Sequence, residues 1–211
     1  MSLWQFVIRG GWLMIPIIIC GALTLAVIIE RLIALKRSET DAEKFISAVE
    51  QKMKKRKIRE SLELCENTQG PVARLVYRAL IKSDKPPEVI RENIQDEANM
   101  IIPYLEKYLG ILATIATVAP LLGLLGTVTG LIKAFMVIEA KSGLVNPADL
   151  ARGIWEALIT TVAGLVVSIP AYLGYNYLVS RVNGLISDME RAASKIMDIL
   201  LFLRSEDEGI K

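Results

Sequence analysis

The chain has 211 residues, of which 53% are hydrophobic and 23% charged, and its mean hydropathy is +0.42. This composition is more apolar than that of an ordinary soluble domain, so it argues against a purely soluble protein. The net charge is only +2, and the chain contains no histidine, which removes the commonest metal ligand and the commonest general base. We therefore expect no enzyme activity, no bound metal and no cofactor.

Three uncharged runs interrupt the charged sequence, at Gly10–Ile29, Tyr108–Ile132 and Ala157–Ser180. Each is about 20 to 25 residues long, which is enough for a helix to cross a bilayer. They predict an all-α membrane protein with three transmembrane helices and long cytoplasmic helical extensions. The expected segments are an N-terminal periplasmic piece with the first span (1–34), a cytoplasmic loop (35–107), the second span (108–132), a periplasmic loop (133–156), the third span (157–180) and a cytoplasmic C-terminal helix (181–211).

Basic residues are distributed unevenly between the predicted loops. Lys and Arg number 16 from Arg31 to Lys107, against three between the second and third spans. Because basic loops stay in the cytoplasm, we expect the N-terminus on the periplasmic side and the C-terminus inside. The basic run Lys52–Arg59 could also suggest nucleic acid. A topology signal is the better interpretation, since 13 acidic residues in the same loop would repel phosphates.

The 35–107 loop shows a series of helical patterns. Residues 39–66 predict one charged amphipathic helix with Ile58, Leu62 and Leu64 as its buried stripe. The sequence Gln69-Gly70-Pro71 predicts a break, followed by a helix over Val72–Lys82. After a second break at 84–87, the pattern from Glu88 leads into the second span as one long helix, kinked at Pro103.

The second span has two different faces when residues are placed 100° apart. One carries leucine and valine, and the other is small and mildly polar. The small face holds Ala113, Ala116, Ala119, Pro120, Gly123, Gly126, Thr127 and Gly130.

The third span repeats this design. Asn146 and Pro147 predict a helix start, with the asparagine as cap. The small, hydroxyl-bearing face covers roughly 140°, and the helical pattern continues far beyond Arg181. This face holds Ala157, Thr160, Thr161, Gly164, Ser168, Ala171 and Tyr175, with Glu156 at its rim.

Two interpretations of these faces are open. Small residues allow close helix packing, and threonine can bond its own backbone. Alternatively, the faces line a pore, which would require several copies of the chain in a ring. No span carries a carboxylate at its middle, and Glu156 lies only at the outer end of the third. If protons pass, the relay carboxylate should come from another chain lying against Thr127 and Thr161.

Three motifs resemble the MotA/TolQ/ExbB proton-channel family, in its ExbB/TolQ branch. They are GW-LM-P with ER at 11–31, P-LLGLLGTVTG-I at 120–132, and GI-EAL-TT-AGL-V-IPA at 153–171. The resemblance implies a homopentameric ring in the bacterial cytoplasmic membrane. It implies lipid around this ring and, inside it, an ExbD/TolR-like partner with an intramembrane aspartate, which can act on a TonB/TolA-like protein.

The resemblance also assigns residues to the proton pathway. It matches the family threonines to Thr127 and Thr161 and the family glutamate to Glu156, with Thr160 beside them; Gly123, Gly164 and Ser168 complete the predicted pore lining. An ExbB-like role in energising TonB-dependent transport is favoured over a TolQ-like role in envelope maintenance. The alternative is a structural membrane scaffold ring that conducts no protons.

Overall fold

The computed structural model describes residues 10–38, 40–140 and 146–209, and within these ranges every regular element is a helix. The chain forms two compact units. The first unit comprises two segments, the described residues up to Glu30 and Tyr108–Tyr177. The second unit comprises Arg31–Lys107 and the described residues from Leu178 onward.

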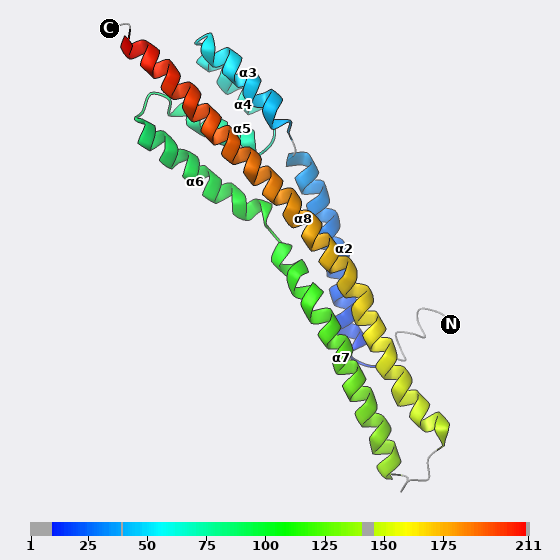
Figure 1. Cartoon of the computed structure of the whole chain (residues 1–211). Coiled ribbons are helices and arrows are strands. Elements are labelled where there is room, and N and C mark those ends of the chain that lie inside the picture. The colour runs from blue at the N-terminus through cyan, green and yellow to red at the C-terminus, as the bar shows by residue number, and fades with distance from the viewer. Residues whose placement is uncertain (1–9, 39, 141–145, 210–211) are drawn as a thin grey trace. The chain divides into compact units, whose positions relative to one another are not determined.

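Among the described residues, three helices are long and apolar enough to cross a membrane. They are α2 (Met14–Ser38), α7 (Leu109–Ala140) and α8 (Pro147–Gly209). The first unit holds the whole of α7 and the N-terminal parts of the other two. The structure confirms the all-helical class, and the three helices are candidates for the three expected spans. Figure 1 shows α7 and the first part of α8 running side by side in opposite directions. Both helices extend beyond the uncharged runs, since α7 continues to Ala140 and α8 begins at Pro147.

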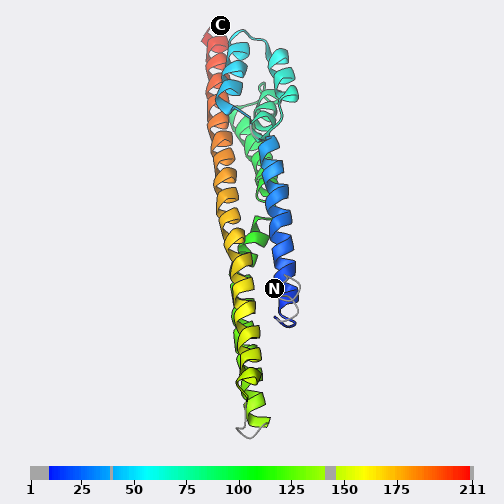
Figure 2. The same cartoon turned by 90° about the vertical axis from the view of Figure 1, so that its right-hand side faces the viewer.

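Helix α8 is continuous for 63 residues, as the sequence pattern predicted (Figure 2). It begins at Pro147, and the side chain of Asn146 caps this end because its Oδ1 accepts a hydrogen bond from the backbone N–H of Ala148 at 3.1 Å. This confirms the predicted helix start. The side-chain amide satisfies one of the backbone donors that a helix N-terminus leaves without an intrahelical partner.

The second unit places four shorter helices beside the C-terminal half of α8 (Figure 2). They are α3 (Ala42–Lys54), α4 (Ile58–Asn67), α5 (Pro71–Ile81) and α6 (Pro87–Leu105). The predicted break before Pro71 and the helix after it are confirmed. Helix α5 buries the apolar side predicted for it, which holds Leu75, Val76, Ala79 and Leu80.

The prediction of one helix over 39–66 is wrong. Arg56 has a φ of +54°, a left-handed conformation that ends α3 and lets the chain start again as α4. After this turn, α4 buries a different side from the one that the sequence predicted. Ser61 and Cys65 are buried, whereas Ile58 is 42% exposed, so the predicted stripe of Ile58, Leu62 and Leu64 is wrong as well.

The prediction of one long helix from Glu88 through the second span is also wrong. Helix α6 ends at Leu105, and α7 starts at Leu109 after Tyr108, whose φ is +66°. Arg31, only 1% exposed, donates from Nη1 to the carbonyl of Tyr104 at 3.0 Å. Its guanidinium also lies 5.8 Å from the centre of the Tyr104 ring. This buried cation satisfies a carbonyl in the last turn of α6, which offsets the backbone bonds lost at the break.

A buried carboxylate joins α5 to α6. Glu97 accepts from Arg74 Nη2 at 2.7 Å and from Arg78 Nε at 2.8 Å, and its side chain is 4% exposed. Burial acts to raise the pKa of Glu97, but the hydrogen bonds from Arg78 and Arg74 outweigh it and hold the pKa below its usual value. Folding of the second unit therefore favours the ionised form of Glu97.

Candidate functional site

The small faces of α7 and α8 pack directly against each other. A methyl group added to Gly164 would lie 2.5 Å from the carbonyl oxygen of Ala119, and one added to Gly130 would lie 2.8 Å from that of Gly153. A methyl on Gly126 would collide with the side chain of Thr160. The two backbones approach closely because these positions have no side chain, which is how small residues join helices within a membrane.

Hydroxyl groups add hydrogen bonds across this contact. Thr161 Oγ1 donates to the carbonyl of Gly123 at 3.1 Å, and Ser168 Oγ donates to that of Ala116 at 2.7 Å. Thr160 instead bonds within α8, to the carbonyl of Ala157 at 2.9 Å, and is 1% exposed. Each of these three hydroxyl groups donates a hydrogen bond to a backbone carbonyl, so none of the three is buried without an acceptor.

Four of the predicted pore residues are therefore buried between α7 and α8 within one chain: Gly123, Thr160, Gly164 and Ser168. For these positions the structure shows the helix-packing interpretation of the sequence. Their predicted role in a pore lining stays a prediction.

Thr161 lies at the edge of this contact, about 100° round α8 from the buried Thr160. It is half-buried. The side of α8 that faces α2 lies elsewhere: a methyl on Gly21 of α2 would contact Val167, and one on Gly174 would contact Ile28 of α2. Helix geometry therefore places Thr161 on the flank of α8 that α2 does not cover.

Thr127 occupies the corresponding edge of α7. It is half-buried and follows Gly123, the residue that accepts the hydrogen bond from Thr161, by one helical turn. Its own Oγ1 donates to the carbonyl of Leu124 at 2.6 Å. The two predicted pore threonines thus lie on the same flank of the α7–α8 pair, which we call the hydroxyl flank (Thr127 and Thr161).

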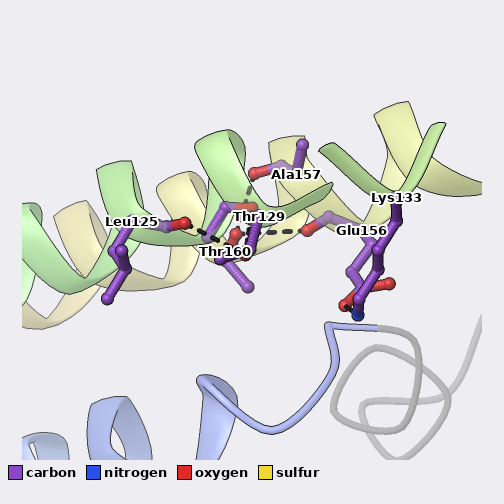
Figure 3. Close-up of polar contacts among 7 residues, drawn as sticks. Leu125, Thr129, Lys133, Glu156, Ala157 and Thr160 are labelled. Carbon is purple, nitrogen blue, oxygen red and sulfur yellow. Dashed lines mark hydrogen bonds and ion pairs between the residues drawn. The ribbon is translucent and has the colours of Figure 1, made fainter. Parts of the chain in front are cut away.

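Glu156 lies on the other flank of α8, about 140° from Thr161. Its Oε1 forms an ion pair with Lys133 Nζ of α7 (Figure 3). Thr129 and Thr160 lie on this side too, and Thr129 Oγ1 bonds to the carbonyl of Leu125 at 3.0 Å. The structure therefore separates Glu156 from the two threonines that the sequence grouped with it.

Residues 24–191 match the model of the MotA/TolQ/ExbB proton channel family. The chain belongs to this family. It is 31% identical to a putative biopolymer transport protein ExbB-like 3 of Synechocystis, over 79% of this chain and 80% of that protein. It is 32% identical to biopolymer transport protein exbB1 of Vibrio cholerae, over 84% of this chain and 79% of that protein. It is 37% identical to the Tol-Pal system protein TolQ of Haemophilus influenzae, over 57% of this chain and 54% of that protein.

In this family member, sequence reasoning missed the partner of Glu156. Lys133 and Glu156 are 23 residues apart and belong to different helices. No short motif connects the two positions. Only the antiparallel pairing of α7 with α8 brings them together. Thr129 was missed because the 100° pattern places it outside the small face of α7.

The described ranges contain no group of three or more His, Cys, Asp or Glu side chains that could hold a metal ion. The α7–α8 pair presents hydroxyl groups, backbone carbonyls and the ion pair of Lys133 with Glu156.

Proposed function

We propose that this chain is the proton-conducting subunit of an ExbB–ExbD or TolQ–TolR type complex, which converts the proton motive force into mechanical work. The observation that carries the proposal is the hydroxyl flank. In a chain of this family, Thr127 and Thr161 lie on one side of a helix pair that has no carboxylate at its middle. That side is left uncovered by α2 and is available to another chain.

The threonines would form hydrogen bonds to the group that carries the proton and would not carry it themselves. A hydroxyl both donates and accepts hydrogen bonds. The Thr127 hydroxyl donates a hydrogen bond to the carbonyl of Leu124, and its oxygen can still accept one from water or from a neutral carboxylic acid. A carboxylate brought against this flank by a partner helix would lose water. Its pKa would rise, and it could alternate between charged and neutral forms. The membrane field supplies about 2.3 kcal/mol per charge per 100 mV for this cycle.

The proposed assembly follows from this division of labour. Five copies would form a ring, with Thr127 and Thr161 facing an ExbD/TolR-like partner that carries an aspartate within its span. The N-terminus would lie in the periplasm and the C-terminus in the cytoplasm, so that work reaches the periplasm and outer membrane. We favour ExbB-like energising of TonB-dependent transport over a TolQ-like role, since four of the relatives that match most of this chain have ExbB in their names.

The test removes one hydroxyl at a time by replacing threonine with valine, which has nearly the same shape. Thr127→Val is the sharper variant, because the Thr127 hydroxyl makes no bond to α8, whereas Thr161→Val also breaks the bond to Gly123. Thr114→Val is the matched control. Thr114 is an exposed threonine of α7 that bonds to Gly110 of its own helix and lies about 140° from Thr127.

The chain would be produced together with an ExbD/TolR-like single-span protein, and proton entry into vesicles would be followed with a pH-sensitive dye. We expect Thr127→Val and Thr161→Val to lower the flux at least about tenfold, as removal of a positioned hydrogen-bonding group does. Thr114→Val should conduct like the unmodified complex. Normal flux in both flank variants, with the ring intact by native mass spectrometry, would contradict the proposal.

A structural scaffold ring is the second candidate, and the close packing of Gly126, Gly130 and Gly164 against the facing helix favours it. A scaffold needs only this packing. It predicts an assembled complex that admits no protons even without substitution, and full tolerance of Thr127→Val. The same vesicle experiment therefore separates the two functions.

A further inference from the structure

Three elements meet at the carboxylate of Glu156. Lys133 of α7 forms an ion pair with its Oε1. The turn that leads into α2 approaches from another direction, and a methyl group added to Gly11 would collide with the same oxygen and lie 3.1 Å from the carboxylate carbon. In Figure 3 the ribbon of this turn passes directly below Lys133 and Glu156.

The turn depends on glycine at this point. Gly11 has a φ of +70°, which side chains other than glycine rarely adopt, and its neighbour Gly10 packs against Met14 and Ile159. The backbone of the turn closes on itself, with the N–H of Met14 donating to the carbonyl of Gly11 at 3.2 Å and that of Ile15 to the carbonyl of Trp12 at 3.2 Å. Because an added methyl at Gly11 would strike the carboxylate, only glycine allows the turn to lie this close to Glu156.

The two side chains of the ion pair differ in how much of their surface is exposed. The side chain of Glu156 is 18% exposed, whereas that of Lys133 is 51% exposed. A mostly covered carboxylate costs free energy unless a cation or donor compensates it, and the flexible lysine can supply the charge from the more open side. Lys133 thus pairs with the Glu156 carboxylate from the more open side, while the carboxylate lies beside the turn and away from the hydroxyl flank.

We propose that Glu156, Lys133 and Gly11 form a carboxylate latch, in which the ion pair of Glu156 with Lys133 holds the N-terminal turn against the α7–α8 pair. In this role Glu156 does not itself transfer protons. Lys133 is then a positioning residue, and what the latch requires at 133 and 156 is one charge of each sign. The latch does not depend on proton conduction, so it can hold even if the proposed function fails.

The test measures amide hydrogen exchange of Met14 and Ile15 in the full chain in lipid nanodiscs. We expect Glu156→Gln and Lys133→Gln each to speed this exchange at least about fivefold, the effect of losing about 1 kcal/mol from a partly exposed ion pair. Lys133→Arg should retain protection because it keeps the cation. Arg152→Gln, an exposed charge one turn before Glu156, is the matched control and should leave the exchange unchanged.

The charge-reversed pair, Lys133→Glu with Glu156→Lys, separates fastening from proton transfer. The latch predicts that it restores protection of the turn and, in vesicles that conduct protons, restores the flux to within about twofold of the original. Unchanged exchange in Glu156→Gln would overturn the latch, as would loss of protection in both Lys133→Arg and the reversed pair. Restored protection with abolished flux would overturn the statement that Glu156 carries no proton.

Discussion

The close approach of α7 and α8 predicts a specific cost for a single added methyl group, in the variant Gly126→Ala. The new carbon would lie 3.0 Å from Thr160 Cγ2 and closer still to Thr160 Oγ1 and Cβ. Carbon atoms pack best at about 3.5–4.0 Å, and the contact with Thr160 Cβ falls short of this by roughly 1 Å, so the helices must separate by at least about that distance. Thr160 is β-branched and 1% exposed, so it has little freedom to move.

The magnitude follows from two opposing terms. Overpacking in a tight contact costs up to about 3 kcal/mol. Replacing glycine by alanine within a helix returns up to about 1 kcal/mol. The free energy of unfolding of Gly126→Ala should therefore fall by about 2 kcal/mol.

The assay is unfolding in mild-detergent micelles by titration with dodecyl sulfate, followed by circular dichroism. Gly184→Ala is the matched control, since Gly184 is a glycine of α8 with no atom within 4 Å of an added methyl, and it should be neutral or stabilising. The double variant Gly126→Ala with Thr160→Gly moves the volume across the contact and should recover at least about 1 kcal/mol. A loss below about 0.5 kcal/mol in Gly126→Ala would refute the packing argument.

Two further predictions concern single hydrogen-bonding groups. Ser168→Ala removes the 2.7 Å bond to Ala116 and should lower the unfolding free energy in micelles by about 0.6 kcal/mol, the average for such bonds in membrane proteins; no loss would mean that the bond adds nothing to the packing. Glu97→Gln should lower protection of α5 and α6 amides by about 2 kcal/mol near pH 7, discounted from a fully buried pair because both arginines are half exposed or more. The folded-state pKa of Glu97 lies below its unfolded value, so the stabilisation is complete above the unfolded pKa and is lost as the pH falls through the folded one. Amide exchange corrected for intrinsic rates should show the original chain and Glu97→Gln converging below about pH 4, and a constant difference down to pH 2 would contradict this account.

Much of the fold could be predicted because the solvent changes along the chain. Within a bilayer a single segment satisfies all its own backbone groups only as a helix, so an uncharged run of about 20 residues predicts both the helix and its length. Local chemistry also predicts helix starts, as Asn146 and Pro71 do, because capping and the fixed φ of proline act within a few residues. The motifs of the second and third spans sufficed to predict the family.

The two breaks that the sequence did not predict lie where a left-handed residue is not glycine. Arg56 and Tyr108 have no local signal for such a conformation. The break between α6 and α7 is compensated by Arg31, which is 73 residues from the carbonyl that it bonds. A contact at that separation exists only after the chain has folded, so no pattern around Tyr108 could predict it.

The functional residues divide in the same way. Spacing by 100° placed Thr160, Thr161, Ser168 and Glu156 on or beside one arc, because each step of the helix is set by the backbone alone. An arc of about 140° is wide enough to face two neighbours. Only the packing of α7 and α2 against α8 decided that Thr160 and Ser168 are buried. The same packing decided that Thr161 lies with Thr127 on the flank that α2 does not cover, and that Glu156 pairs with Lys133.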